Sequence, residues 1–369
     1  MAHVRKQMIS FFLTTKCNLR CVYCYTYKSQ NLKKEHQSLD FNFAKRGMDD
    51  FFRDNASRHI RFYGIGEPTL EFELMKKIKD YAYKKAGKSL TVELQTNGFF
   101  SEKIATWIAK NVNILWVSCD GPAKVHDIQR PTATKKPTSA IVEKNLKYFA
   151  KQKSMQAGVR VTLTPLMMKR QLEIVEYFHS IGIKYINVLP AFAPIEENSP
   201  STVFKWDPIE FAKNFLVAHK KAKKLGVWYN TMCIVNFDEK TRHACRACTP
   251  NPHITTDGYV SCCDFTQLGP EYSPGPLQQL IYGKYIPEKD VIVYDEKAVA
   301  NVRSRCVENL KKKTCSDCKY IDNCAGGCLG QVVNETGDIL GKCEKNCEIV
   351  RYLAERMELN KKLYPALHS

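Results

Sequence analysis

The sequence has no apolar run long enough to cross a membrane. A membrane-spanning helix needs about 18 or more apolar residues in succession, and the only apolar run before Cys17 is the short segment ISFFL. That segment is also too short for the apolar part of a signal peptide. A repeat of fixed period and a low-complexity linker are lacking as well. We therefore predict a soluble cytoplasmic protein that has no membrane partner.

Acidic residues are scarce relative to basic ones. The chain has 56 Lys and Arg against 38 Asp and Glu, which gives a net charge of +18. Much of this excess stands in lysine-rich stretches at 219–224 and 311–313, and such stretches are typical of solvated helix faces. Attraction of an acidic partner, such as an acidic peptide or a nucleic acid, is the alternative. Charge alone does not separate these interpretations.

Cysteine, by contrast, is abundant, with 16 residues in the chain. Disulfides are disfavoured in the cytoplasm, so metal or iron–sulfur ligation explains this number better. Three cysteines, Cys17, Cys21 and Cys24, stand close together with no fourth nearby. A structural zinc site uses four protein ligands. This loop would therefore leave one coordination position of a bound centre open.

Apolar β-like runs alternate with amphipathic helical stretches from residue 7 to about 190. The runs predict buried parallel strands at 8–15, 59–64, 90–96, 114–120, 159–164 and 185–190. Six βα units predict an α/β fold whose parallel sheet is either doubly wound or curled into a barrel. In barrels the chemistry sits at the carboxyl ends of the strands. Distinctive residues follow the expected strand ends, namely Cys17, Gly64, Asn97, Asp120 and Pro190.

The cysteine loop resembles that of the radical S-adenosylmethionine (SAM) enzymes, in which spacings of three and then two residues follow the first strand. In that family the three thiolates hold a [4Fe–4S] cluster, and its remaining iron binds the amino and carboxylate groups of SAM. One electron then cleaves SAM to a 5′-deoxyadenosyl radical. The resemblance implies a partial (β/α)6 TIM-like barrel over residues 1–230, with the segment 191–201 as a loop leading out of it.

Further motifs carry the resemblance along the barrel: GIGEP at 64–68, QTNG at 95–98, SCDGP at 118–122 and HDIQRP at 126–131. The resemblance implies that Glu67 accepts from the SAM ammonium and that Arg130 pairs with its carboxylate. Ser118 and Asp120 are expected near the ribose, although Asp120 or Arg130 alone is as well explained as an ordinary loop residue. The complete implied SAM-binding set is Tyr23, Gly64, Gly66, Glu67, Pro68, Asn97, Ser118, Asp120, Arg130 and Leu189. Cys119 is expected in the core.

A second cysteine-rich region, about 231–350, resembles the SPASM extension of radical SAM enzymes, which holds two auxiliary [4Fe–4S] clusters. The resemblance implies that the first cluster takes Cys245, Cys248, Cys263 and Cys328. It implies that the second takes Cys315, Cys318, Cys324 and one of Cys343 or Cys347, of which we prefer Cys347. Cys233, Cys262 and Cys306 are left over, and a closing helix is expected over 351–369. A zinc-ribbon pair that binds nucleic acid explains CSDC and CAGGC in isolation but not the barrel motifs.

The resemblance implies a peptide or protein substrate and a flavodoxin- or ferredoxin-type reductant. Two subclasses compete, the maturases of ribosomally made peptides and the anaerobic sulfatase maturases, which form formylglycine. The peptide maturases form thioether or carbon–carbon bonds or epimerise residues. We prefer this subclass because Cys245 stands three residues before Cys248. In addition, Arg242 occupies the position where sulfatase maturases usually have cysteine. The early position of Cys17 weakens a leader-dependent maturase. For the sulfatase maturases, Asp264 after Cys263 is the expected catalytic base.

Overall fold

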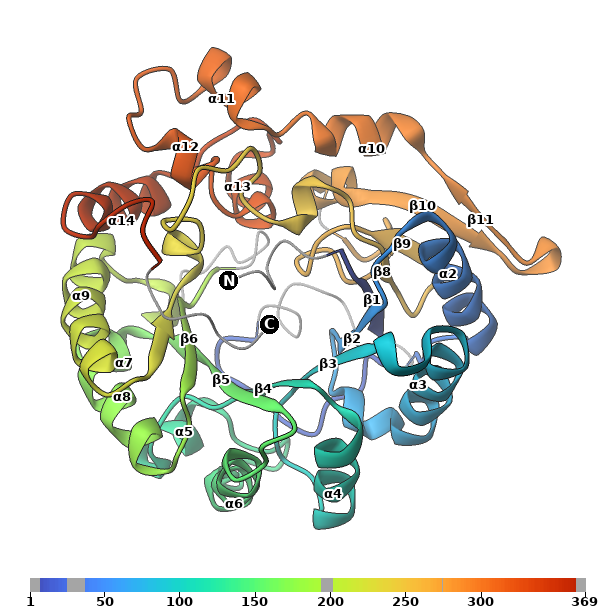
Figure 1. Ribbon diagram of the computed structural model, residues 1–369, viewed down its shortest axis with the longest axis horizontal. Helices are drawn as coiled ribbons and strands as arrows, with labels where there is room; N and C mark the ends of the chain where they lie inside the picture. Colours follow the sequence, from blue (N-terminus) through green and yellow to red (C-terminus); the bar gives the residue numbers. More distant parts are fainter. Residues whose placement is uncertain (1–6, 25–36, 194–201, 274, 363–369) are drawn as a thin grey trace.

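A single sheet organises the chain. The computed structural model describes residues 7–24, 37–193, 202–273 and 275–362. The eleven strands of these residues follow the order β11-β10-β9-β8-β1-β2-β3-β4-β5-β6-β7. Neighbouring strands from β1 to β7 are parallel, and they curve around a central space with helices outside (Figure 1). The predicted α/β fold with a partial parallel barrel is confirmed.

The six predicted strands all form, and the structure adds a seventh to the barrel. The barrel strands are β1 (Ile9–Phe12), β2 (His59–Tyr63), β3 (Thr91–Thr96), β4 (Ile114–Ser118), β5 (Gln156–Leu163), β6 (Tyr185–Pro190) and β7 (Trp228–Asn230). Strand β7 pairs with β6 in parallel. With only three residues it is too short to show a periodic pattern in the sequence. Residues 194–201 of the predicted loop lie outside the described residues.

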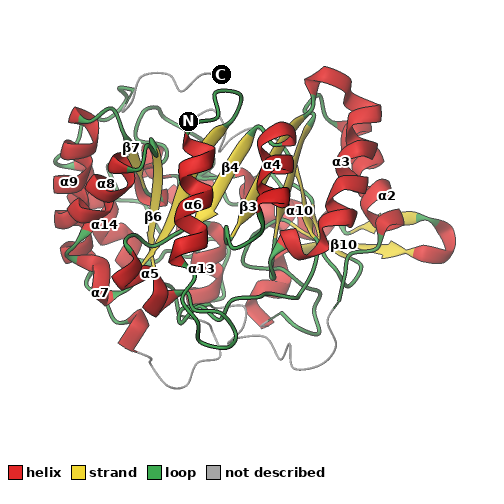
Figure 2. Cartoon of the chain, turned by 90° about the horizontal axis from the view of Figure 1, so that it is seen from below, coloured by secondary structure: helices red, strands yellow, loops and turns green. Residues whose placement is uncertain are grey.

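Helices cover the outer face of these strands, as Figure 2 shows for α3, α4 and α6. The helices that follow the barrel strands are α2 (Phe41–Asp54), α3 (Phe72–Ala86), α4 (Glu102–Asn111), α5 (Ala123–Gln129), α6 (Ser139–Ala150), α7 (Pro165–Met168), α8 (Gln171–Ser180) and α9 (Pro208–Lys224). Helix α2 begins where the Asp40 carboxylate accepts from the N–H of Phe43, the usual N-cap arrangement. The buried side of α2 includes Phe43, Met48 and Phe51. Burial of this apolar side against the core holds the helix on the sheet.

The cysteine-rich region extends the barrel sheet instead of forming a separate one. Its strands are β8 (His253–Ile254), β9 (Tyr259–Ser261), β10 (Ile281–Ile286) and β11 (Val291–Tyr294). Strand β8 pairs in parallel with β1, and β9 to β11 continue antiparallel. The sequence did not predict this junction because β8 has only two residues. The pairing places the two cysteine-bearing regions next to each other.

The remaining helices lie beside the barrel, between α9 and the projecting β10–β11 hairpin (Figure 1). They are α10 (Glu296–Arg303), α11 (Val307–Lys313), α12 (Ile321–Cys324), α13 (Leu329–Thr336) and α14 (Glu344–Ala354). The closing helix thus begins and ends earlier than the predicted 351–369, of which 363–369 lie outside the described residues. After α14 the chain turns back, because the N–H of Asn360 donates to the carbonyl of Phe237 at 2.7 Å.

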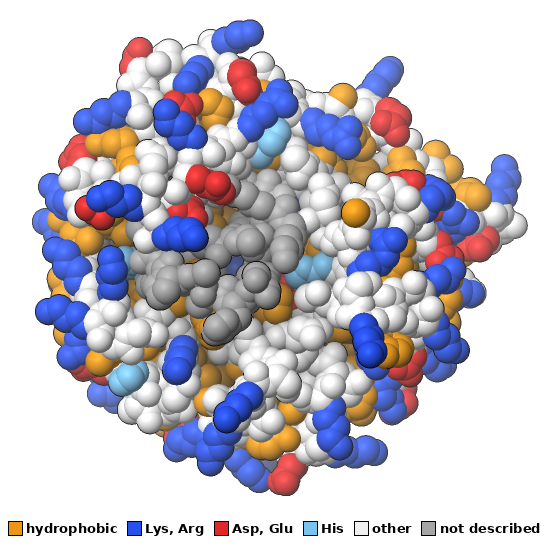
Figure 3. All heavy atoms as spheres, in the orientation of Figure 1, with side chains coloured by type: hydrophobic (Ala, Val, Ile, Leu, Met, Phe, Trp, Pro, Cys, Tyr) orange, Lys and Arg blue, Asp and Glu red, His pale blue; other side chains and the backbone are white. Residues whose placement is uncertain are grey.

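Basic side chains are spread over the molecule. On the face seen in Figure 3, Lys and Arg surround the whole periphery, with acidic side chains among them. The last turn of α9 contains Lys221, Lys223 and Lys224, where positive charge is favoured by the helix dipole. This distribution fits the interpretation of the charge as solvated helix faces. Among the described residues, no helix is long and apolar enough to cross a membrane.

Candidate active site

A cavity of about 420 Å³ occupies the inside of the barrel. Inward-facing side chains of the strands form its wall, and on β5 these are Gln156, Arg160 and Thr162. The cysteine loop and the segment around β8 and β9 complete it. Two groups of cysteines from opposite ends of the sequence therefore open onto one space, namely Cys17, Cys21 and Cys24, and Cys245, Cys262, Cys263 and Cys328.

The cysteine loop is fixed to the segment that follows α5. The N–H groups of Arg20 and Val22 donate to the carbonyls of Pro131 and Gln129 at 2.8 and 2.9 Å. Burial raises the pKa of Cys17 to about 11 and that of Cys21 to about 12, and the charge of the neighbouring Cys24 raises both further. The three thiols are therefore neighbours on a loop whose backbone is held in place.

Gly66 brings the end of β2 against this loop. Its N–H donates to the carbonyl of Thr14 at 3.0 Å, and the N–H of Glu67 donates to that of Lys16 at 2.7 Å. A Cβ atom on Gly66 would lie 2.1 Å from the Lys16 oxygen and 2.6 Å from the Thr14 oxygen, so no side chain fits there. The glycine of this motif therefore allows the end of β2 to approach the backbone that leads into the cysteine loop.

Glu67 is buried, and protein donors occupy its carboxylate. Oε1 accepts from the Thr69 N–H at 3.1 Å, from the Thr69 hydroxyl at 2.7 Å and from the Thr96 hydroxyl at 2.5 Å, while Oε2 accepts from the Asn97 N–H at 2.6 Å. A carboxylate offers about four acceptor sites. Three of these four bonds end on Oε1 and one on Oε2, and Glu67 lines the cavity, so its contact with the SAM ammonium stays a prediction. Within the protein, Glu67 joins the ends of β2 and β3.

Tyr23, Asp120 and Arg130 form one buried group. The Tyr23 hydroxyl donates to Asp120 Oδ2 at 2.7 Å and accepts from Arg130 Nη1. Asp120 also accepts from Gln129 Nε2 at 2.9 Å and from the Thr162 N–H at 3.0 Å. Asp120 is fully buried and is not among the residues that line the cavity, and its contact with the ribose stays a prediction. Asp120 orients Tyr23, which does line the cavity.

Most other predicted SAM-binding residues line the cavity, namely Gly64, Pro68, Asn97, Ser118, Arg130 and Leu189. Arg130 Nε is buried and has no hydrogen-bond partner among the described residues. The side chain of Asn97 is already engaged, since Nδ2 donates to Asn18 Oδ1 at 2.7 Å and Oδ1 accepts from the Phe99 N–H at 2.8 Å. A guanidinium with a free donor beside three thiols fits a cluster-bound amino acid that carries a carboxylate.

The first set of auxiliary cysteines is assembled from distant segments. A hydrogen bond from Cys248 lowers the pKa of Cys245 to about 6. Burial raises the pKa of Cys328 to about 12, and the charge of Cys245 contributes. Burial and the charge of Cys328 raise the pKa of Cys263. The four thiols predicted for the first auxiliary cluster are therefore connected in the order Cys248, Cys245, Cys328 and Cys263.

The second set gathers around Cys324. Burial raises its pKa to about 12, and charges on Cys347, Cys318 and Cys315 add to the effect. The thiol of Cys343 instead hydrogen-bonds with Glu335, so this placement supports Cys347 as the fourth ligand. Within the described ranges, no three His, Cys, Asp or Glu side chains could hold one metal ion. The thiols of the described residues thus do not form a compact single-ion site.

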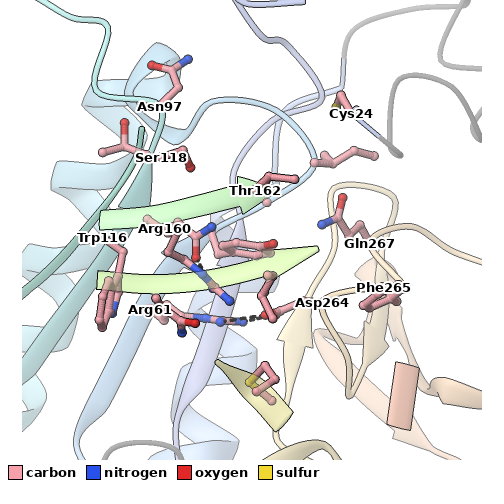
Figure 4. A pocket seen from close by; sticks show the side chains of 18 of the residues that line it. Cys24, Arg61, Asn97, Trp116, Ser118, Arg160, Thr162, Asp264, Phe265 and Gln267 are labelled. Atoms are coloured by element: carbon pink, nitrogen blue, oxygen red, sulfur yellow. Dashed lines mark hydrogen bonds and ion pairs between the residues drawn. The ribbon is translucent and has the colours of Figure 1, made fainter. Parts of the chain in front are cut away.

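Asp264 lies in the cavity wall and is paired with Arg61 (Figure 4). Arg61 donates to both carboxylate oxygens, with Nη1 3.1 Å from Oδ2, and His253 Nδ1 lies 3.7 Å from Oδ1. Burial opposes ionisation of Asp264, but the guanidinium of Arg61 outweighs it and holds the pKa well below its usual range. The ion pair weakens this carboxylate as a base, and its catalytic role stays a prediction.

Sequence reasoning missed three residues of this region. Arg61 and Arg160 line the cavity, and Cys233 lies close enough to Cys324 and Cys347 for their charges to raise its pKa. The two arginines could have been found from the sequence, because each stands inside a predicted buried strand. Burying a charged side chain there costs free energy unless the side chain faces a polar site. Cys119 and Cys306 are buried thiols, as expected.

Comparisons with known proteins agree with this geometry. Residues 11–192 match the model of the radical SAM superfamily. An uncharacterized protein of Methanocaldococcus jannaschii is 31% identical over 47% of this chain and 59% of its own length. The cysteine-type anaerobic sulfatase-maturating enzyme of Clostridium perfringens is 24% identical over 85% of each chain.

Solved structures share the fold over nearly the whole chain. The structure of anSMEcpe with bound AdoMet has a TM-score of 0.72 at 20% identity and covers 95% of this chain and 93% of that one. Streptococcus suis SuiB bound to its precursor peptide SuiA has a TM-score of 0.64 at 15% identity, covering 94% of this chain and 76% of that one. The likeness therefore includes the cysteine-rich region as well as the barrel.

Proposed function

Because residues 11–192 form a radical SAM domain and the chain is thus an enzyme of that superfamily, we propose that it is a SPASM-type maturase that modifies a peptide or protein. One observation carries the proposal. The cavity inside the barrel is lined both by the three thiols of the N-terminal loop and by Cys245, Cys263 and Cys328. A substrate in this cavity would touch both cysteine groups.

The residues of the barrel fit the cofactors of the superfamily. Cys17, Cys21 and Cys24 would hold the [4Fe–4S] cluster, and reductive cleavage of SAM there supplies the 5′-deoxyadenosyl radical that abstracts hydrogen from the substrate. Arg130, whose buried Nε has no partner among the described residues, would bind the SAM carboxylate. Tyr23 is held against the cavity by Asp120. The wall residues keep bulk water away from the reacting atoms.

The cysteine-rich region fits two auxiliary clusters. Cys245, Cys248, Cys263 and Cys328 would hold the first, and Cys315, Cys318, Cys324 and Cys347 the second. Such clusters supply a route for electrons between a substrate and an external reductant of the flavodoxin or ferredoxin type. Ligands on the cavity wall, such as Cys263 and Cys328, would keep that route next to the substrate.

Two kinds of relative support a peptidyl substrate. The name of the Clostridium perfringens relative states that it matures sulfatases, and SuiB was solved with its precursor peptide. We propose a ribosomal-peptide maturase as the function and a sulfatase maturase as the second candidate. The ribosomal-peptide maturase is preferred because of the spacing between Cys245 and Cys248. The second is favoured by the shared length with the sulfatase-maturating relative and by Asp264 in the cavity wall.

The function is tested with anaerobically reconstituted enzyme, SAM and a chemical reductant. Three clusters correspond to about twelve irons per chain. Replacing Cys17, Cys21 and Cys24 together by Ala should abolish formation of 5′-deoxyadenosine and leave about eight irons. Cys119→Ala, at a buried thiol outside both sets, is the matched control and should keep both. Undiminished cleavage in the triple variant, or zinc in place of iron, would contradict the proposal.

Mass spectrometry of peptides separates the two candidates. A sulfatase-motif peptide with a central cysteine should be converted to formylglycine only if the second candidate is correct. In that case Asp264→Asn should keep iron content and SAM cleavage while lowering the yield of formylglycine by about 10²–10⁴-fold, the scale of general-base catalysis. Wild-type yield in that variant would leave Asp264 a partner of Arg61 only.

A further inference from the structure

A row of polar side chains crosses the inner wall of the barrel. Arg160 on β5 is in register with Ser118 on β4 and with Asn187 on β6. All three line the cavity. Residues in register on parallel strands point to the same side of the sheet, so this row presents a guanidinium flanked by a hydroxyl and an amide.

Arg160 forms no ion pair in the part of the chain that the structure describes, although its charge is one of those that lower the pKa of Asp264. Its Nη1 donates to the amide oxygen of Gln95 at 2.6 Å. The nearest acidic groups are already engaged, because Asp264 pairs with Arg61 and Glu93 lies 3.1 Å from His59 Nε2. Figure 4 shows Arg160 next to the Arg61–Asp264 pair in the same cavity. The Oδ1 atom of Asn187 is also buried without a hydrogen-bond partner.

Arg160 shares this part of the wall with two other arginines, Arg61 and Arg246, and with the carboxylates of Glu93 and Asp264. A guanidinium that faces a cavity and hydrogen-bonds to a neutral amide gains most from a ligand that brings a carboxylate, because hydrogen bonds between charged groups are stronger than neutral ones.

The region next to Arg160 is apolar and aromatic. The rings of Trp116 and Trp228 have centroids 6.1 Å apart, and both line the cavity. Gly158 leaves them room, since a Cβ atom there would lie 2.6 Å from the Trp116 ring. Low local dielectric strengthens an ion pair that forms beside such a wall. The surroundings of Arg160 thus favour an anion that contacts the guanidinium directly over one that keeps its shell of water.

We propose that Arg160 binds a carboxylate of the peptide substrate, while Oδ1 of Asn187 beside it accepts from an N–H of the same peptide. The guanidinium fork matches a carboxylate with two parallel hydrogen bonds. The carboxylate comes either from an acidic side chain or from the C-terminus of the peptide. This inference rests on the proposed peptide maturase function, and it makes acidic peptides the substrate class.

Calorimetry with capped peptides tests the inference on the reconstituted enzyme. Saturating SAM is present without reductant, so that no probe can occupy the SAM carboxylate position and no chemistry occurs. The probes are acetyl-Gly-Phe-Glu-Gly-amide, the same peptide with Gln in place of Glu, and acetyl-Gly-Phe-Gly with a free carboxyl terminus. We expect at least one carboxylate probe to bind about tenfold or more tightly than the Gln peptide. Whichever carboxylate probe binds tightly identifies the source.

Variants assign the discrimination to Arg160. Arg160→Gln should remove the preference for the carboxylate. Gln95→Glu should remove it too, because it supplies the guanidinium with an internal carboxylate at the 2.6 Å position while Arg160 stays in place. Arg170→Gln, which alters an arginine paired with Glu173 on an outer helix, should keep it. Equal affinity for all probes, a preference that survives Arg160→Gln, or loss of SAM binding in that variant would overturn the inference.

Failure of the broader proposal would give a different result. If the enzyme does not act on peptides, no probe should bind and no peptide should raise the rate of 5′-deoxyadenosine formation. If only the carboxylate inference is wrong, peptides should still bind or stimulate cleavage, with equal strength for Glu and Gln. The two failures are therefore separated by the Gln peptide.

Discussion

Replacement of Glu67 by Gln tests whether this residue binds the cofactor or joins two strands. Glutamine keeps the shape of the side chain but has one acceptor oxygen and an amide donor. The best orientation keeps its oxygen on the three donors of Thr69 and Thr96 and turns the amide toward the Asn97 N–H. Two donors then face each other in a buried place.

The cost of this replacement can be worked out from the four hydrogen bonds. A buried N–H that loses its acceptor costs about 1–3 kcal/mol. The three bonds that remain lose their ionic acceptor, but burial opposes the charge of Glu67 and raises its pKa, so we take about 1 kcal/mol for the three bonds together. We expect a loss of roughly 3 kcal/mol in the free energy of unfolding, a large part of the about 5–15 kcal/mol of a typical domain.

The consequence should reach the cysteine loop. Glu67 and Gly66 hold that loop through their backbone N–H groups, so a loosened carboxylate should lower the iron content of the N-terminal site. Thermal unfolding and iron content are measured anaerobically without SAM, so that cofactor affinity does not enter. Glu73→Gln is the control, because Glu73 forms only an exposed pair with Lys76 and such pairs contribute about 0–1 kcal/mol. An unchanged unfolding temperature and iron content, with SAM affinity reduced tenfold, would refute this reasoning and support the ammonium contact.

Two further replacements test the cysteine sites. Cys347→Ala should lower auxiliary iron more than Cys343→Ala. The reason is that Cys347 lies with Cys315 and Cys324, while Cys343 contacts Glu335. The reverse order of iron loss would identify Cys343 as the ligand. Gly66→Ala should lose the SAM-binding cluster, because its Cβ would lie 2.1 Å from a backbone oxygen, whereas Gly275→Ala, in open space, should keep wild-type iron and cleavage. Normal cleavage by Gly66→Ala would show that the loop can move away.

Much of the barrel could be predicted from its sequence because the relevant signals are local. Each long strand carries an apolar run of its own, as β5 does at Gln156–Leu163, and the cysteine loop lies within eight residues. Strands β7 and β8 escaped prediction because three and two residues carry no measurable periodicity. Strand β8 forms because β1 offers it an unpaired edge, which is a property of the folded sheet.

The candidate site divides in the same way. Sequence alone identified which residue types stand at the strand ends, and the cavity contains most of them. It predicts cofactor contacts for Glu67 and Asp120, but a motif shows only that a carboxylate is present and not which protein donors surround it. In the structure these donors are Thr96 and Asn97 for Glu67, and Tyr23 for Asp120.

The sequence by itself determined the radical SAM character of this protein, because the three thiols of that chemistry are neighbours along the chain. Only the tertiary structure decided the contents of the cavity. Arg61 and Asp264 stand 203 residues apart, yet they pair in the cavity wall, beside Arg160 (Figure 4). Such pairings depend on which inward-facing residues the curvature of the sheet brings together, and that curvature is set by the packing of all strands and helices at once.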